Sequence, residues 1–339
     1  MEEKVSVCIP VYNGADTILE TIQSILNQTF KDFELVIVDN ASTDSTVDII
    51  KSVKDNRIKI YGNEKNIGCG ENLEECKKRA TGDILFYISS DDIADVNALR
   101  KMYDAFQISK DIGIVTRPYY WFDDDFQKPV RITKQFAQTQ KVSINDLSST
   151  HSYEKIKDVI ASSDQISGIG FRRKYMNFSF RNEHFVEMAF VVLPMLKDCK
   201  VVILKDNIVA VRISKSGSMD PVVYKNSPMM AWYDLINTTY YEDKFRGLRK
   251  YLIHNFIANN YVGLVQIKNF GSYEFLFREI YYLIKLRWLN IFDPRFWVFS
   301  IGTIIIPRFI LRKLVVIYKN KINSRFLKDI DIINLKERV

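Results

Sequence analysis

The chain has 339 residues, of which 47% are hydrophobic and 26% are charged. This balance is typical of a globular protein and excludes global disorder, and the length allows one large domain and a smaller one. The formal net charge of +7 is unevenly spread, because residues 244–339 contain 18 Lys and Arg against 6 Asp and Glu. The preceding part is net acidic, so the two parts are expected to perform different tasks.

The four cysteines form no CxxC pair, and the three histidines are scattered. We therefore expect no zinc site, and we expect reduced cysteines in a cytosolic protein. The N-terminal stretch MEEKVSVCIP is acidic and leads directly into a strand pattern, so no secretory signal is expected.

Apolar runs rich in β-branched residues alternate with segments of helical spacing over the first 90 residues. This alternation predicts an α/β fold with a mostly parallel sheet flanked by helices. Strands are expected at residues 4–12, 33–40, 57–62 and 83–90, and helices at 15–28, 42–53 and 68–82.

The later elements are less regular. Residues 112–122 are expected to form further strand, residues 167–176 a strand entering a helix, and residues 186–196 an apolar helix. Residues 200–213 have a strand-turn-strand pattern, and the chain beyond about residue 216 is expected to be helical.

Polar residues follow two of the expected strands at the point where each strand ends. Asp39 and Asn40 follow one strand, and the stretch FYISSDDI places Asp91 and Asp92 after another. Adjacent carboxylates repel each other and are poor strand formers, so a cation or a ligand is expected to stabilise them. Parallel sheets bind ligands at the carboxyl ends of their strands, which is where these residues fall.

An ordered set of motifs is similar to one known family. VSVCIPVYNGADTILETIQSILNQTF, ELVIVDNASTDST, NIGCGEN, ATGDILFYISSDD and IVAVRISKSGS come in its order and spacing across residues 4–218. The chain therefore resembles the family 2 glycosyltransferases, which transfer sugars from nucleotide-diphospho-sugars and have the Rossmann-like GT-A fold. The resemblance implies residues 1–218 as the GT-A domain and residues 219–339 as a basic, aromatic-rich helical region.

The resemblance also implies a donor site, in which the Asp39 carboxylate accepts from a pyrimidine N–H. Its metal-binding aspartate falls on Asp91, with Asp92 beside it, and the implied metal is Mn²⁺ or Mg²⁺ bridging the diphosphate. The residues implied in nucleotide binding are Pro10, Val11, Tyr12, Asp39, Gly68, Asn72, Ser90 and Asp91.

The chain departs from the family pattern at two positions. Ser89 stands where the family usually has the first aspartate of a DxD motif, and Met188 stands where it commonly has the catalytic base. Glu187 is the remaining carboxylate of that pair, with Glu183 and His184 one turn earlier, and it is the expected base.

Structural alternatives compete with each assignment. Asp91 and Asp92 can serve as helix N-caps, and Asp39 can be a turn residue. Glu187 can be a helix-surface residue. Arg212 matches a family arginine that can face the diphosphate, and an ion pair is an equal alternative.

The basic tail combines Trp, Tyr and Phe with Lys and Arg, and its longest uncharged stretch is 12 residues, Phe296–Pro307. A membrane span needs about 20 residues. The pattern after Pro307 is instead typical of a helix lying on a membrane surface, and the alternative is the core of a helical subdomain. No nucleic-acid motif accompanies the charge, so no nucleic-acid partner is expected.

The first hypothesis is an inverting glycosyltransferase that moves a sugar, expected to come from a UDP-sugar, to a glycan or polyprenyl-linked acceptor in cell-surface polysaccharide biosynthesis. It would be cytoplasmic and peripheral at the inner face of the membrane. The alternative is a non-catalytic relative that binds a nucleotide and acts as a scaffold, having lost part of the DxD motif and the base.

Overall fold

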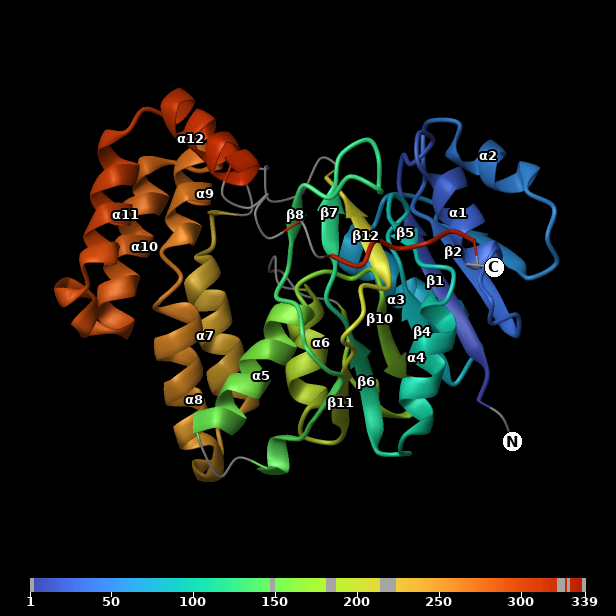
Figure 1. Cartoon of the computed structure of the whole chain (residues 1–339), viewed down its shortest axis with the longest axis horizontal. Coiled ribbons are helices and arrows are strands. Elements are labelled where there is room, and N and C mark those ends of the chain that lie inside the picture. The colour runs from blue at the N-terminus through green and yellow to red at the C-terminus, as the bar shows by residue number, and fades with distance from the viewer. Residues whose placement is uncertain are drawn as a thin grey trace.

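The computed structural model describes residues 3–146, 150–180, 187–213, 224–321, 327 and 330–336 (Figure 1). Eight strands form its central sheet: β1 (Val5–Val11), β2 (Phe33–Asp39), β3 (Ile58–Gly62), β4 (Ile84–Tyr87), β6 (Ile112–Thr116), β9 (Gln140–Val142), β10 (Ile169–Arg172) and β11 (Lys200–Ile203). Their order is β3-β2-β1-β4-β10-β6-β11-β9. Only β10 and β9 run antiparallel to their neighbours, which confirms the mostly parallel sheet.

A second sheet has the order β5-β12-β7-β8. Its strands are β5 (Ile93–Ala94), β7 (Tyr120–Phe122), β8 (Arg131–Ile132) and β12 (Val209–Arg212). The expected strand at 112–122 is therefore two strands, one in each sheet, and the strand-turn-strand at 200–213 is divided in the same way. The alternation of apolar and polar residues along a strand cannot show which sheet the strand joins, because both sheets bury similar side chains.

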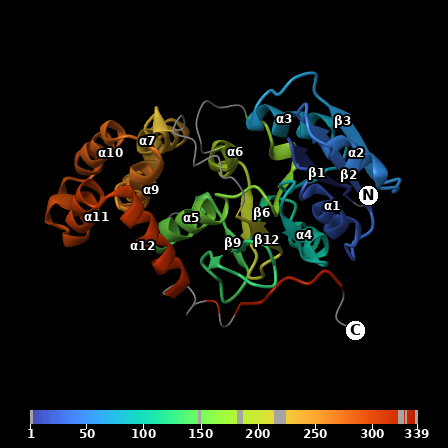
Figure 2. The ribbon, with the colours of Figure 1, turned by 90° about the horizontal axis from the view of Figure 1, so that it is seen from above.

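Helices cover both faces of the central sheet (Figures 1 and 2). One face packs against α1 (Ile18–Leu26), α2 (Thr46–Ser52) and α4 (Ala98–Gln107). The other packs against α3 (Cys69–Arg79), α5 (Thr150–Ser162) and α6 (Glu187–Met195). In α1 the buried side chains Ile18, Ile22 and Ile25 recur at helical spacing, which is why the sequence predicts this helix correctly.

The C-terminal region is helical, as expected. It consists of α7 (Pro228–Thr239), α8 (Arg246–Leu252), α9 (Val262–Phe270), α10 (Tyr273–Leu286), α11 (Pro294–Ile305) and α12 (Arg308–Lys321). These helices lie beyond α5 and α6 in both views (Figures 1 and 2). Within the described ranges, every helix is too short or too polar to cross a bilayer.

The chain then returns to the N-terminal half. Residues 330–336, here called the strap, cross the second sheet next to β12 and β5 (Figure 1). Ile333 is buried there with Ile93, Tyr120 and Ala210. The strap is the part of the C-terminal third that does not fit the helical expectation, and nothing in its sequence marks where it docks.

Candidate active site

The structure brings the predicted donor-site segments together at one edge of the central sheet. Asp39 ends β2 directly beside Val11, which ends β1, and the N–H of Asn40 donates to the Val11 carbonyl at 2.8 Å. The segment after β4 reaches the same edge, because the Thr17 hydroxyl donates to the Ser90 carbonyl at 3.0 Å. This is the carboxyl end of the parallel strands, as expected.

The loops after β1 and β2 are tied to each other by side chain to backbone hydrogen bonds. The N–H of Asn13 donates to the Ser42 hydroxyl at 2.8 Å, and the Asn13 amide oxygen accepts from the N–H of Thr43 at 2.8 Å. The N–H of Gly14 donates to the Thr46 hydroxyl at 2.8 Å. Pro10 is half-buried, Val11 is buried and Tyr12 is exposed. The loops thus hold one aromatic side chain open to solvent.

Asp39 is 6% exposed, and its carboxylate accepts from the N–H of Ser42 at 3.1 Å. The turn role weighed in the sequence is therefore present. A carboxylate has about four acceptor positions, so this bond leaves capacity for a ligand N–H.

Gly68 and Asn72 support the same edge from the start of α3. Gly68 has φ = +88°, which favours glycine, and no atom lies within 4 Å of where a Cβ would stand. Asn72 is buried, its amide nitrogen donates to the Val38 carbonyl at 3.0 Å, and its amide oxygen accepts from Asn63 at 2.9 Å. Asn72 therefore fixes the end of β2 beside Asp39.

The two adjacent aspartates have different environments. Asp91 is half-buried, and its carboxylate has no partner among the described residues. Asp92 is 1% exposed and accepts from the Ser167 hydroxyl at 2.5 Å and from the N–H of Arg212 at 2.7 Å. Burial, followed by the charge of Asp91, raises the pKa of Asp92 well above its usual range. Asp92 thus joins three segments, whereas the Asp91 carboxylate stays available to a ligand.

Ser167 is itself positioned by a fully buried arginine. The Arg117 guanidinium donates to the carbonyls of Ser162, at 2.7 Å, and of Gln165, at 3.0 Å, and also to the Ser167 carbonyl. Gly168, with φ = +86°, follows, and a Cβ there would lie 2.7 Å from Arg117 Nε. Glycine is required at this position by both the backbone conformation and the space.

Of the two roles that the sequence allows for Arg212, the structure shows the ion pair. Its guanidinium bonds the Glu20 carboxylate, donates to the Asp91 carbonyl at 3.0 Å and lies 4.5 Å from the centre of the Phe122 ring. Arg212 therefore fixes the backbone of the Asp91 turn.

A divalent cation has a restricted choice of ligands here. No group of three His, Cys, Asp or Glu placed for a metal occurs in the described part of the chain. Ser89 is half-exposed, and its N–H donates to the Ser167 hydroxyl at 2.8 Å. One free carboxylate, at Asp91, fits Mg²⁺ or Mn²⁺ only if the substrate phosphates complete the shell, which is how such ions commonly bind.

The expected base lies at the edge of the described chain. Glu187 is the first residue of α6, but its side chain falls outside the described residues, as do Glu183 and His184. Met188 is 6% exposed and packs in the core shared by α5, α6 and α7. Methionine at this position therefore fills the core.

Sequence reasoning did not find Ser167, Arg117 or Glu20. Each acts through a contact between residues that are distant along the chain, and Ser167 and Asp92 are 75 residues apart. The local sequence SGIGF carries a turn signal at Gly168 but nothing that marks the serine.

The comparisons with known proteins agree with this fold. Residues 6–176, half of the chain, match the family model of glycosyl transferase family 2. Glycosyltransferase GlyG of Streptococcus pneumoniae serotype 4 is 31% identical over 37% of this chain and 42% of its own length. UDP-Glc:alpha-D-GlcNAc-diphosphoundecaprenol beta-1,3-glucosyltransferase WfaP of Escherichia coli is 41% identical over 26% of this chain and 36% of its own length. The chain therefore spans less than half of these relatives.

Two solved structures have the same fold at low identity. TarS 1-349 of S. aureus in complex with UDP-GlcNAc has a TM-score of 0.61 and 17% identity, over 98% of this chain and 95% of that chain. Mannosyltransferase PcManGT of Pyrobaculum calidifontis, in complex with GDP-Man and Mn²⁺, has a TM-score of 0.51 and 15% identity, over 90% of this chain and 87% of that chain.

The fold is that of the GT-A class, and the matched region identifies the family. The chain belongs to glycosyl transferase family 2.

We predict that Asp92 acts on folding through its hydrogen bonds. Asp92→Ala leaves the Ser167 hydroxyl and the N–H of Arg212 without an acceptor, so the free energy of unfolding should fall by about 2 kcal/mol. Asp92→Asn keeps an acceptor oxygen and should stay close to wild type. Asp91→Ala should also leave the melting temperature unchanged. Denaturant and thermal unfolding of the three variants check this; equal stability of Asp92→Ala and wild type would contradict it.

Proposed function

We propose that this chain is an inverting glycosyltransferase that uses a UDP-sugar as donor and a glycan or lipid-linked acceptor in cell-surface polysaccharide biosynthesis. The observation that carries the proposal is that Asp39, the last residue of β2, and the turn that contains Asp91 both contact the segment at the end of β1 or directly after it. Both lie in the segment that matches the family.

In this proposal the loops after β1, β2 and β4 bind the donor. Asp39 accepts from the uracil N–H with its free lone pairs, and Tyr12 lies beside the base. Gly68 and Asn72 hold the end of β2 in place, and Ser90 and Asp91 face the diphosphate. TarS, which shares the fold, was solved with UDP-GlcNAc, and this supports the choice of a uridine donor.

The diphosphate of the donor needs positive charge, and the residues assigned to the donor site supply little of it. Asp39 and Asp91 are acidic, and the charge of Arg212 is neutralised by Glu20. We propose that Asp91 holds a Mn²⁺ or Mg²⁺ ion together with the donor phosphates, with Asp92 behind it. Such an ion, when bound, would neutralise the charge that develops on the leaving nucleoside diphosphate. PcManGT, solved with Mn²⁺, supports this assignment.

The transfer itself needs a base at the acceptor. We propose that the Glu187 carboxylate takes the proton of the acceptor hydroxyl while its oxygen attacks the anomeric carbon. The bond from that carbon to the diphosphate breaks on the opposite side, so the configuration is inverted. The start of α6 is a suitable position, because the amino end of a helix stabilises a negative carboxylate.

The acceptor is proposed to be lipid-linked, because the name of WfaP states a diphosphoundecaprenol acceptor. The C-terminal region (219–339 in the two-domain division that we propose) would carry the chain to the membrane surface.

Two arginines of α12 act within this region. Arg308 and Arg312 donate to the carbonyls of Lys268, Asn269 and Gly271, so they stabilise the end of α9.

The apolar residues of this region support membrane contact. Large hydrophobic side chains on α11, α12 and the turn before them are exposed, far more than the isolated cases usual on a soluble surface. These are Trp288, Leu289, Phe292, Trp297, Val298, Ile301, Ile305, Phe309, Ile310, Leu314, Val316 and Ile317. We propose that they lie in the inner face of the cell membrane, with the enzyme peripheral on its cytoplasmic side.

A non-catalytic scaffold is the second candidate, favoured by Ser89 and Met188. The burial of Met188 weakens this argument, because methionine there has a packing role independent of catalysis. The two candidates differ in whether sugar is transferred.

We predict that UDP binding depends on Asp91 and on the metal. In calorimetry with Mn²⁺, Asp91→Ala should bind UDP at least tenfold more weakly than wild type and lose the dependence on the metal. Asp104→Ala removes an exposed carboxylate from α4 and serves as the matched control. Equal affinity of wild type and Asp91→Ala would overturn the metal assignment, and no UDP binding by wild type would overturn the uridine donor.

We predict that Glu187→Gln separates transfer from donor binding. The amide cannot take a proton, so the transfer rate should fall by about 10²–10⁴ while UDP affinity is unchanged. Glu183→Gln, four residues earlier in the sequence, is the control. Full transfer by Glu187→Gln, measured with the donor and acceptor that wild type uses, would exclude it as the base.

A further inference from the structure

A groove of about 320 Å³ lies between α7, α8 and α10 in the C-terminal region. Five of the residues that line it are basic or can become so: Arg246, Arg249, Lys250, His254 and Lys285. Neither Asp nor Glu lines it. The groove is therefore lined mainly by positively charged side chains, and its remaining residues are polar or apolar.

Most of this charge is available to a ligand. Arg249 is fixed, because its guanidinium donates to the carbonyls of Tyr240 and Glu242. Arg246, Lys250 and Lys285 are exposed and form no ion pair within the described part of the chain. Burial, followed by the charges of Lys250 and Arg287, lowers the pKa of His254.

The groove adjoins the exposed apolar surface. Leu286 lines it at the end of α10, and the short helical turn Trp288–Phe292 begins two residues later. Trp288 is 63% exposed and Phe292 is 70% exposed. Positive charge beside exposed aromatic rings suits a molecule with a phosphate head and an apolar chain.

We propose that this groove binds the phosphate of an anionic phospholipid headgroup at the membrane surface. Arg246, Lys250 and Lys285 contact the phosphate, and Trp288 and Phe292 lie among the upper acyl chains. The inference rests on the membrane contact under the proposed function and adds a specific headgroup site to it.

Vesicle sedimentation tests the groove. Wild type should bind vesicles of phosphatidylcholine with phosphatidylglycerol more tightly than vesicles of phosphatidylcholine alone. Arg246→Glu/Lys250→Glu should lose about tenfold in binding to the anionic vesicles. Lys110→Glu/Lys128→Glu, which changes the net charge equally on the N-terminal half, should bind like wild type. Inorganic phosphate should compete only weakly, since it lacks the apolar chain.

The outcomes separate the groove from membrane contact in general. If Trp288→Ala/Phe292→Ala abolishes binding while the groove variant binds like wild type, membrane contact stands and the groove proposal fails. Equal losses in the groove and control variants would also overturn the groove, because net charge would then explain the binding. If wild type binds no vesicles, membrane contact and the groove fail together, and the donor-site proposal is unaffected.

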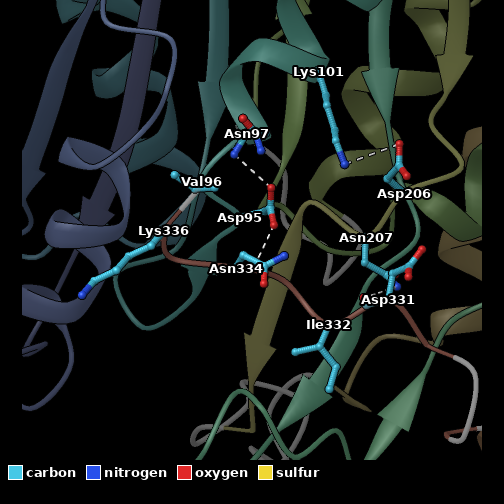
Figure 3. A pocket seen from close by; sticks show the side chains of 10 residues that line it. All are labelled: Asp95, Val96, Asn97, Lys101, Asp206, Asn207, Asp331, Ile332, Asn334 and Lys336. Carbon is cyan, nitrogen blue, oxygen red and sulfur yellow. Dashed lines mark hydrogen bonds and ion pairs between the residues drawn. The ribbon is translucent and has the colours of Figure 1, made fainter. Parts of the chain in front are cut away.

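The strap provides a second, independent inference. Figure 3 shows Asp95 hydrogen-bonded to both Asn97 and Asn334, in a cavity of about 710 Å³ that the strap helps to line. The Asn334 N–H donates to Asp95 Oδ2 at 2.8 Å, and its carbonyl accepts from the N–H of Val96 at 2.7 Å. Ile333 is 3% exposed, whereas its neighbour Ile332 is 37% exposed.

The strap is connected to the turn that contains Asp91 through two neighbours of Ile333. Ile333 packs in the same cluster as Ile93, which directly follows Asp92, and as Phe122, against which Arg212 stacks. Arg212 in turn donates to the Asp91 carbonyl. We infer that the strap is a positioning element of the donor site, acting through Ile333 on the turn that presents Asp91. The inference rests on the proposed donor site.

Substitutions at neighbouring positions test the strap. Ile333→Asp should weaken UDP binding in calorimetry at least tenfold, while Ile332→Asp and the conservative Ile333→Val should bind like wild type. Asn334→Pro removes the N–H that donates to Asp95 without burying a charge. If Ile333→Asp does not fold, the UDP affinity of Asn334→Pro tests the strap instead, and it should also be at least tenfold weaker than that of wild type. A variant with a lower melting temperature but wild-type UDP affinity would show a purely structural strap. No UDP binding by wild type would instead overturn the donor site itself.

Discussion

The buried carboxylate of Asp92 is the interaction on which the candidate site depends. It accepts from a hydroxyl on the loop before β10 and from the backbone at the end of β12, so it connects the two sheets. Burying a carboxyl group is costly unless it is hydrogen-bonded, and here each of its oxygens accepts a hydrogen bond. The preceding residue, Asp91, is half-buried, and its carboxylate has no partner among the described residues. The adjacent aspartates thus have different environments: Asp92 holds the turn, and we propose that Asp91 faces the substrate.

The buried arginine at position 117 extends this support. It binds three carbonyls of the loop that carries Ser167, and burial lowers its pKa to about 10, so it is still cationic at neutral pH. Arg212 and the strap support the turn from the second sheet. The candidate site is therefore held by contacts between segments that are distant along the chain, which is the preorganisation that the proposed transfer needs.

The sequence predicts the first half of the fold well, because strong helical and strand periodicities alternate there and the chain order of motifs matches one family. It also predicts that Asp39 and Asp91 lie at the same end of the sheet, since parallel strands place their carboxyl ends together. It does not predict which sheet β7 and β12 join, the roles of Ser167 and Glu20, or the docking of the strap. Those depend on contacts between distant residues, for which one sequence has no local signal.

The most direct test of this account is the UDP affinity of Asp92→Asn and Asp92→Ala in the presence of Mn²⁺. If Asp92 acts through its hydrogen bonds, Asp92→Asn should bind UDP within about threefold of wild type and Asp92→Ala at least tenfold more weakly. If Asp92→Asn instead loses as much affinity as Asp92→Ala, the charge of Asp92 acts on the metal directly. That result would contradict the division of tasks between the two aspartates.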